Sequence, residues 1–351
     1  MTRTKKRKYT SVEICAGAGG QAVGLHNAGF KHVALIEIDR DACQTLRSNT
    51  SANPEWEGCR VIEADLKDFQ ADALGLEPGE LDLLAGGVPC PPFSAAGKQL
   101  GRDDDRDLFP TMLRLVDDLE PKAVMIENVR GLLDPKFDEY RQDIIKQLES
   151  MGYEECYWDI LEAKDYGVPQ LRPRAILVAM KPEYARHFEH HKPTKTKVIT
   201  VGDALHDSMR ARYDAVADDP RAENAFKRWY ERALDGVAPT VVGGSKKHGG
   251  ADLGPTRAKK AWAELGVCGM GVANEPDEMK DSERDLFAPA GPKLTVTQAA
   301  LIQGFPEGWK FSGRKTAAYR QVGNAFPPPV AQAVGDQIYA AFEAAAQAEK
   351  G

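Results

Sequence analysis

Two kinds of apolar spacing alternate along the first 180 residues. Short apolar runs, typical of buried strands, are followed by stretches with apolar residues three and four apart, as on an amphipathic helix. These patterns predict strands at 12–15, 32–38, 60–64, 81–85, 123–127 and 175–180, and helices at 20–28, 40–48, 108–119 and 137–151. Strands and helices in regular alternation indicate a mostly parallel, doubly wound sheet, so we predict an α/β fold.

The alternation stops near residue 181. Residues 181–292 are polar, rich in glycine and charge, and irregular in their apolar spacing. Such a stretch is too long for a loop inside a compact domain, so it predicts a second, smaller domain. Regular spacing returns near Thr295, and an alanine-rich helix is expected at 331–346. We therefore predict a first domain formed by 1–180 and 319–351, a second formed by 181–292, and a hinge at 293–318.

Composition narrows the class of protein. The 351 residues are 42% hydrophobic and 28% charged, as in globular proteins, and no apolar run approaches the ~20 residues that span a membrane. The basic start MTRTKKRKY is not followed by the apolar stretch of a secretory signal. Six cysteines without a C-x-x-C pair indicate reduced thiols, so we expect a cytoplasmic protein without membrane contact.

The net charge of −7 argues weakly against a nucleic-acid partner, but the charges are unevenly distributed. Residues 241–260 carry five basic side chains against the single acid Asp252, and the first eight residues carry five basic side chains and no acid. Such patches are able to contact phosphates locally. A solvated tail and a solvated loop would explain the same charges equally well.

Glycines and carboxylates follow three successive predicted strands. The sequence Ala16-Gly17-Ala18-Gly19-Gly20 links the first strand to a helix, where glycine lets the backbone turn sharply and approach a ligand. Glu37 ends the second strand, where an acid hydrogen-bonds ribose hydroxyls, and Asp65 follows the third, where it would meet an adenine amino group. The glycine-rich turn alone would more often be a plain tight turn, but the three positions together predict a nucleotide-like cofactor.

Cys90 lies in the loop GGVPCPPFS, directly after the strand LDLLA. Most cysteines are small buried residues, but ligands bind at the carboxyl ends of parallel strands, and the flanking prolines stiffen this loop. A thiolate is a strong nucleophile when its pKa is lowered or a base assists. We therefore predict that Cys90 is a nucleophile.

Further motifs supply acidic, basic and amide groups. Glu127 and Asn128 end an apolar strand, where a half-buried carboxyl can act as an acid, unless it is a helix cap or a loop carboxylate. Arg172 and Arg174 alternate on the extended segment QLRPR, so both guanidiniums would face one site, unless they form a surface salt-bridge pair. Asn324, in QVGNAFPPP, would bring its amide to a cofactor.

In this order the motifs resemble those of the DNA (cytosine-5) methyltransferases. EICAGAGG is similar to the family's first cofactor motif, GGVPCPPFS to its catalytic cysteine loop, and ENV to its glutamate motif. QLRPR is similar to its Q-x-R-x-R element, and QGFP with QVGNA to its C-terminal motifs. The resemblance covers residues 11–180 and 293–340. It implies a Rossmann-like, S-adenosyl-L-methionine-dependent methyltransferase sheet, with 181–292 as a target-recognition domain for double-stranded DNA.

The resemblance also implies a role for each site residue. Cys90 would add to C6 of a flipped-out cytosine, and Glu127 would assist at N3. Arg174 would steady the O2 side of the base, and Arg172 would hold phosphate or the catalytic loop. Segment 98–109 matches the family's mobile loop. S-adenosyl-L-methionine would be bound by Cys15, Gly17, Ala18, Gly20, Glu37, Ile38, Asp65, Leu66, Pro89 and Asn324. Cys15 replaces a phenylalanine that is common near the adenine in this family.

Several alternatives stand beside this interpretation. One related group methylates tRNA, although the long glycine- and lysine-rich recognition region favours DNA. A catalytically silent DNA-binding relative would not need Cys90 and Glu127. A nicotinamide dehydrogenase would require G-x-G-x-x-G, which AGAGGQ does not supply. His187, His190 and His191 have no cysteine or carboxylate partner at ligand spacing, so we expect no metal.

The length favours the compact bacterial type of the family. We expect a monomeric enzyme that acts on nucleoid DNA in the cytoplasm. A cognate restriction endonuclease would be a functional partner without direct contact.

Overall fold

The chain forms two compact units that are built from interleaved segments. The computed structural model describes residues 8–89, 107–193, 197–243 and 251–350. Unit 1 consists of Met1–Leu161, Pro173–Lys192 and Val330–Gly351, and unit 2 consists of Glu162–Arg172 and Pro193–Pro329. The chain therefore leaves unit 1 twice and returns to it twice.

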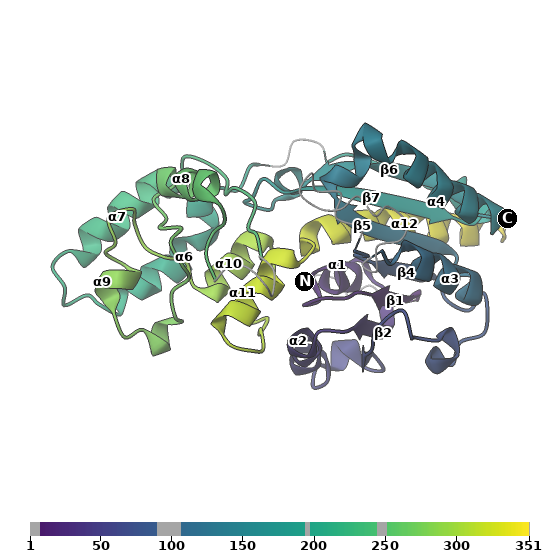
Figure 1. Cartoon of the computed structure of the whole chain (residues 1–351), viewed down its shortest axis with the longest axis horizontal. Coiled ribbons are helices and arrows are strands. Elements are labelled where there is room, and N and C mark those ends of the chain that lie inside the picture. Colours follow the sequence, from purple (N-terminus) through teal and green to yellow (C-terminus); the bar gives the residue numbers. More distant parts are fainter. Residues whose placement is uncertain (1–7, 90–106, 194–196, 244–250, 351) are drawn as a thin grey trace. The chain divides into compact units, whose positions relative to one another are not determined.

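Unit 1 is built on a sheet whose strand order is β3-β2-β1-β4-β5-β7-β6 in the described part of the chain (Figure 1). The strands are β1 (Thr10–Ile14), β2 (Lys31–Glu37), β3 (Arg60–Glu63), β4 (Leu83–Gly86), β5 (Ala123–Val129), β6 (Glu154–Glu162) and β7 (Pro173–Met180). Strand β1 runs parallel to β2 and β4, β2 to β3, and β4 to β5, whereas β7 is antiparallel to β5. This arrangement confirms the predicted α/β fold.

Strand β6 is the one strand of this sheet that the apolar pattern does not predict. In its sequence EECYWDILE charged residues interrupt the apolar ones, and only Leu161 is fully buried. The strand lies at the edge of the sheet, so much of it faces solvent and needs no apolar side chains.

The helices of unit 1 lie close to their predicted positions, except for the short helix α5, which was not predicted. They are α1 (Gly20–Ala28), α2 (Arg40–Thr50), α3 (Phe109–Leu119), α4 (Asp138–Ser150), α5 (Pro182–Ala185) and α12 (Pro328–Ala348). Helix α1 ends at Gly29, which adopts a left-handed conformation with φ 108°. Helix α2 begins after Asp39, whose carboxylate caps it by accepting hydrogen bonds from the N–H groups of Asp41 and Ala42.

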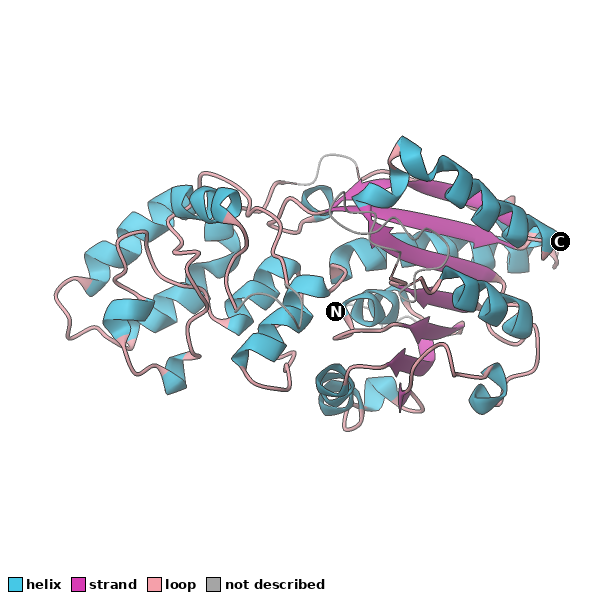
Figure 2. Ribbon diagram, in the orientation of Figure 1, coloured by secondary structure: helices cyan, strands magenta, loops and turns pink. Residues whose placement is uncertain are grey.

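An apolar core of unit 1 lies between the sheet and helices α3 and α4, and Figure 2 shows helices on both sides of the sheet. Val12 and Ile14 belong to this core, so Glu13 between them points to the opposite face. Helix α12 packs on α1 at Gly335, where a Cβ atom would lie only 2.9 Å from Leu25. Packed helices on the two faces of the sheet thus hold β1, β2 and β4 in place, and with them the carboxyl ends of these strands.

Unit 2 is largely helical, although the apolar spacing of residues 181–292 is irregular and indicated no helices there. Its helices are α6 (Val201–Asp214), α7 (Ala222–Ala233), α8 (Thr256–Glu264), α9 (Ser282–Asp285), α10 (Val296–Gln303) and α11 (Lys315–Asn324). Helix α7 shows why they were missed: it buries Ala222, Phe226, Trp229 and Ala233 at helical spacing, but charged residues fill its other face. The many charged residues of this region therefore made its amphipathic helices difficult to predict from the sequence.

The two units also differ from the ranges drawn from the sequence. Residues 162–172 and 293–329 belong to unit 2. The segment before β7 pairs with residues 238–240: Leu171 N–H donates to Ala238 O at 2.8 Å, and the Thr240 hydroxyl donates to Leu171 O at 2.6 Å. The assignment of 181–292 to target recognition stays a prediction.

No helix in the described part of the chain is long and apolar enough to cross a membrane. Across the same residues, no three side chains among His, Cys, Asp and Glu are grouped in a way that would hold a metal ion.

Candidate active site

The glycine-rich turn after β1 reverses the chain by left-handed backbone conformations. Cys15, Gly17 and Gly19 have φ angles of 51°, 54° and 88°. A Cβ atom on Gly17 would meet no heavy atom within 4 Å, so open space borders the backbone there. The conformation favours glycine at 17 and 19, and the open space is what a ligand lying against the turn would require.

Glu37 holds this turn to the end of β2. Its side chain is 9% exposed, and one carboxylate oxygen accepts the N–H of Gly17 at 2.7 Å. The other oxygen accepts the N–H groups of Ile38 at 2.9 Å and Asp39 at 2.7 Å. Burial raises the pKa of Glu37, and the backbone N–H groups oppose that rise. Glu37 is therefore a fixed acceptor at the carboxyl end of a parallel strand.

Three further predicted cofactor residues of unit 1 follow the ends of β2 and β3. Asp65 is exposed just after β3, whereas Leu66 is buried. Ile38 is 63% exposed beside Glu37, so an apolar surface is available to an adenine ring. Burial and the neighbouring carboxylates raise the pKa of the Cys15 thiol to about 12, so Cys15 is a neutral side chain here and not a nucleophile. These residues fit S-adenosyl-L-methionine.

Glu13 is a buried acid in β1, the strand that precedes the glycine-rich turn. It is 1% exposed in β1, and its Oε2 atom has no hydrogen-bond partner within the described residues. Burial, with a further contribution from the charge of Glu37, raises the pKa of Glu13 well above its usual value. The folded protein therefore binds a proton at Glu13 more tightly than the unfolded chain does.

We expect the contribution of Glu13 to the free energy of unfolding to be lost as pH rises above about 4.3, the ordinary glutamate pKa, because the unfolded chain releases the Glu13 proton first. Glu13→Gln removes this contribution, which has a slope of up to about 1.4 kcal/mol per pH unit. Chemical denaturation from pH 4 to 8 would measure the slopes of both proteins. The exposed carboxylate variant Glu63→Gln is the control, and identical pH slopes for wild type and Glu13→Gln would contradict the prediction.

Glu127 lies beside the start of the cysteine loop. It occupies β5, next to β4, and its Oε2 atom would be 2.9 Å from a Cβ atom on Gly87. Its Oε1 atom forms an ion pair with Arg174 Nε at 2.6 Å, and both side chains are largely buried. The antiparallel pairing of β7 with β5 places these two residues close together. The structure thus brings together two of the predicted catalytic residues.

Asn128 fastens the cysteine loop to the same strand. Its Nδ2 donates to Val88 O at 2.8 Å, and its Oδ1 accepts the N–H of Val129. Pro89 O accepts the N–H of Leu108 at 3.2 Å, which joins the two ends of the segment between them. Cys90 and most of the predicted loop 98–109 lie outside the described residues.

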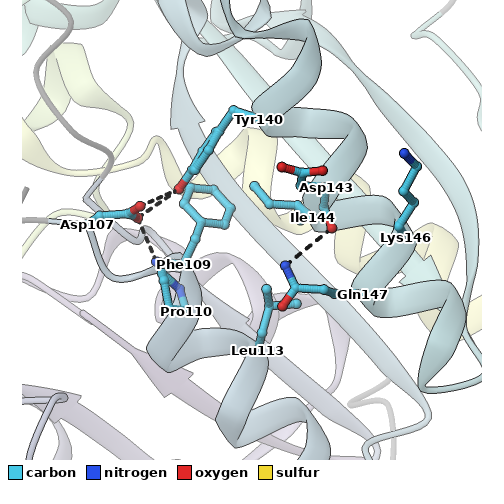
Figure 3. Close-up of a pocket in the computed structure, with 9 residues that line it drawn as sticks. All are labelled: Asp107, Phe109, Pro110, Leu113, Tyr140, Asp143, Ile144, Lys146 and Gln147. Atoms are coloured by element: carbon cyan, nitrogen blue, oxygen red, sulfur yellow. Dashed lines mark hydrogen bonds between the residues drawn. The ribbon is translucent and has the colours of Figure 1, made fainter. Parts of the chain in front are cut away.

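The chain after this segment is anchored by Asp107. The Tyr140 hydroxyl lies 2.8 Å from each of its carboxylate oxygens and donates to them. One of these oxygens also accepts the Phe109 N–H at 3.0 Å (Figure 3). The same residues line a pocket of about 360 Å³ between α3 and α4. None of the predicted catalytic or cofactor residues lines it, so this pocket is distinct from the candidate site.

Arg172 and Arg174 have different hydrogen-bonding partners. The guanidinium of Arg172 donates to Val241 O at 2.7 Å, Gly323 O at 2.7 Å and Ala325 O at 2.9 Å, all in unit 2. The residue is 1% exposed, and its guanidinium hydrogen-bonds to backbone carbonyl oxygens. The phosphate contact implied by the resemblance stays a prediction. Sequence reasoning could not find this role, because its partners lie about 70 and 150 residues away along the chain.

Asn324 is exposed at the end of α11 in unit 2. Gly243 lies against its amide, since a Cβ atom at that position would be 2.4 Å from Asn324 Oδ1. Sequence reasoning missed Gly243, and the only local signal is the pair of glycines in APTVVGG.

Comparisons with known proteins show the family. The family model C-5 cytosine-specific DNA methylase matches residues 9–340. The Type II methyltransferase M.NaeI of Lentzea aerocolonigenes is 52% identical over 335 residues, which cover 94% of this chain and 75% of that protein. The Type II methyltransferase M.NgoMIV of Neisseria gonorrhoeae is 48% identical over 344 residues, covering 96% and 99%.

Among solved structures, the DNMT2 protein of Spodoptera frugiperda has a similar fold, with a TM-score of 0.62 at 15% identity over 95% of this chain and 100% of that one. The match of the family model extends over both units and includes every motif described above. The chain therefore belongs to the C-5 cytosine-specific DNA methylase family.

Proposed function

We propose that this chain methylates cytosine in one specific sequence of double-stranded DNA through a covalent adduct with Cys90. The activity of the family is methyl transfer from S-adenosyl-L-methionine to C5 of cytosine in DNA. The observation that supports the mechanism is the position of the Glu127 carboxylate against Gly87, three residues before Cys90. The Glu127 carboxylate therefore lies close to the start of the loop that carries Cys90, at the carboxyl end of β4.

The chemistry requires both residue types. C5 of cytosine is a poor nucleophile within its aromatic ring. Addition of the Cys90 thiolate to C6, with a proton passing from Glu127 to N3, makes C5 enamine-like and able to take a methyl group. A base such as water then removes the C5 proton, the thiolate leaves, and Glu127 recovers its proton from N3. Because C6 is not accessible inside a duplex, the cytosine must be flipped out.

S-adenosyl-L-methionine supplies the methyl group from a positively charged sulfur. Glu37 would accept the ribose hydroxyls, and Asp65 would accept the adenine amino group. Asn324 would contact the methionine end. Arg174 would hold the Glu127 carboxylate in place through their ion pair and donate towards the O2 side of the base.

The names of the relatives support a proposal for the biological role. Both relatives reported above carry the name Type II methyltransferase. We infer that this chain likewise protects DNA from a restriction endonuclease that it does not touch, and that it acts as a monomer on nucleoid DNA in the cytoplasm. Residues 181–292 would read base edges in the major groove, and the basic residues of 245–260 would contact phosphates.

Incubation with methyl-labelled S-adenosyl-L-methionine tests the proposal, with mixed-sequence duplex DNA and tRNA as parallel substrates. We expect label in the DNA, recovered as 5-methylcytosine, and confined to one sequence context when the product is sequenced after bisulfite treatment. Label in tRNA alone would overturn the choice of substrate. Cofactor binding without label in either substrate would indicate a silent DNA-binding relative.

A further inference from the structure

The backbone at Gly243 packs directly on the Asn324 amide. Besides the close approach to Oδ1, a Cβ atom at 243 would lie 2.8 Å from Asn324 Cγ and 2.5 Å from Arg320 O. A Cβ atom on Gly323 would in turn lie 2.3 Å from the nitrogen of Gly243. The two glycines therefore let residues Val241–Gly243, which we call the brace segment, touch the last turn of α11.

Arg172 ties the brace segment to α11. One terminal nitrogen of its guanidinium donates to Val241 O, and the other donates to the carbonyl oxygens of Gly323 and Ala325. These two residues flank Asn324 in the sequence. A single buried, rigid fork therefore fixes the backbone on both sides of the asparagine and the segment that packs against its amide.

Two buried glutamines complete the arrangement. Gln170 Oε1 accepts the N–H of Val241 at 2.7 Å, and Gln170 Nε2 donates to Gln303 Oε1 at 2.7 Å. Gln303 donates in turn to Ala325 O. Both glutamines are completely buried, so movement of the brace segment would leave polar groups without partners, at a cost in free energy. The segment is therefore a rigid support for the exposed Asn324 side chain.

We propose that Gly243, held in place by Arg172, is a positioning residue that orients the Asn324 amide for the methionine end of the cofactor. This inference rests on the proposed function, in which Asn324 contacts S-adenosyl-L-methionine. An amide that is already oriented loses less rotamer freedom when it binds. Space alone requires glycine at 243, because its φ angle is not in the left-handed region.

Cofactor binding in the absence of DNA tests this role, with S-adenosyl-L-methionine titrated into each protein in a calorimeter. We expect Gly243→Ala to raise the Kd about tenfold, the equivalent of one displaced hydrogen bond. Gly236→Ala is the matched control, because its new methyl group would meet only Leu265 at 3.8 Å in the same unit. Its Kd should equal that of the wild type, and thermal melting should show that both variants are folded.

Asn324→Ala, alone and combined with Gly243→Ala, distinguishes positioning from general damage. If Gly243 acts through Asn324, the double variant should have the Kd of Asn324→Ala alone. Arg172→Lys is a second variant, because lysine cannot bridge the three carbonyl oxygens, and its loss of affinity should likewise vanish in the Asn324→Ala background.

The two proposals fail in different ways. An unchanged Kd for Asn324→Ala would remove the cofactor role of Asn324 from the proposed function. A weakened Asn324→Ala with a normal Gly243→Ala, or effects of the two variants that multiply, would overturn the positioning role of Gly243.

Discussion

Cys90→Ala is expected to abolish methyl transfer to DNA and to leave the affinity for S-adenosyl-L-methionine unchanged. Alanine offers no nucleophile to C6, so C5 stays part of an aromatic ring and cannot attack the methyl group. The predicted cofactor residue Glu37 lies at the end of a different strand, β2, where its carboxylate accepts the N–H groups of Gly17, Ile38 and Asp39. The loss should therefore fall on the chemical step, measured as label transferred under saturating cofactor.

A trapping experiment separates the covalent step from binding. In duplex DNA with 5-fluorocytosine at the target, the fluorine cannot leave as a proton does, so the adduct between wild type and DNA should persist in denaturing gels. Cys90→Ala should form none, whereas Cys156→Ala, a control on β6, should behave as the wild type. Transfer or trapping by Cys90→Ala would refute the assignment of the nucleophile.

Glu127→Gln is expected to slow methyl transfer by about 10²–10⁴, the usual contribution of a general acid. Glutamine keeps the size and hydrogen-bonding capacity of the side chain but has no carboxyl proton to give to N3. Single-turnover rates with saturating DNA and cofactor would measure the effect on chemistry alone.

Loss of the ion pair with Arg174 has to be separated from loss of the acid. Thermal melting of Glu127→Gln reports any destabilisation by the buried guanidinium, and titration with cofactor reports whether the site is intact. Glu139→Gln, at an exposed position on α4, is the control and should retain the wild-type rate. A folded, cofactor-binding Glu127→Gln with a normal single-turnover rate would exclude the acid role.

The sequence by itself determined the parallel strands and the glycine-rich turn at which we predict that the cofactor binds. Buried parallel strands are rich in apolar residues, and a turn with left-handed backbone favours glycine, so β1, β2 and β4 and the turn at Gly17 are visible locally. Glu37 was predictable for the same reason, because a carboxylate at a strand's carboxyl end is defined by its place along the chain. The order of the motifs then sufficed to identify the family.

Sequence patterns failed where exposure or charge hides the apolar signal. Strand β6 lies at the edge of the sheet, and in unit 2 a helix such as α7 has charged residues between its buried positions, so its helical spacing is easily overlooked in the sequence. Periodicity reports only which residues face a core, and these elements face a core with few of their side chains.

Only the tertiary structure decided what the polar motif residues do. Alternation along QLRPR predicts that both arginines face one site, but Arg174 pairs with Glu127 while Arg172 binds carbonyl oxygens of distant segments. The fit of Gly243 against Asn324 is equally invisible in the sequence. A buried charge is stable only where an opposite charge or hydrogen-bond acceptors converge on it, and for Arg172 that convergence depends on contacts between residues about 70 to 150 positions apart.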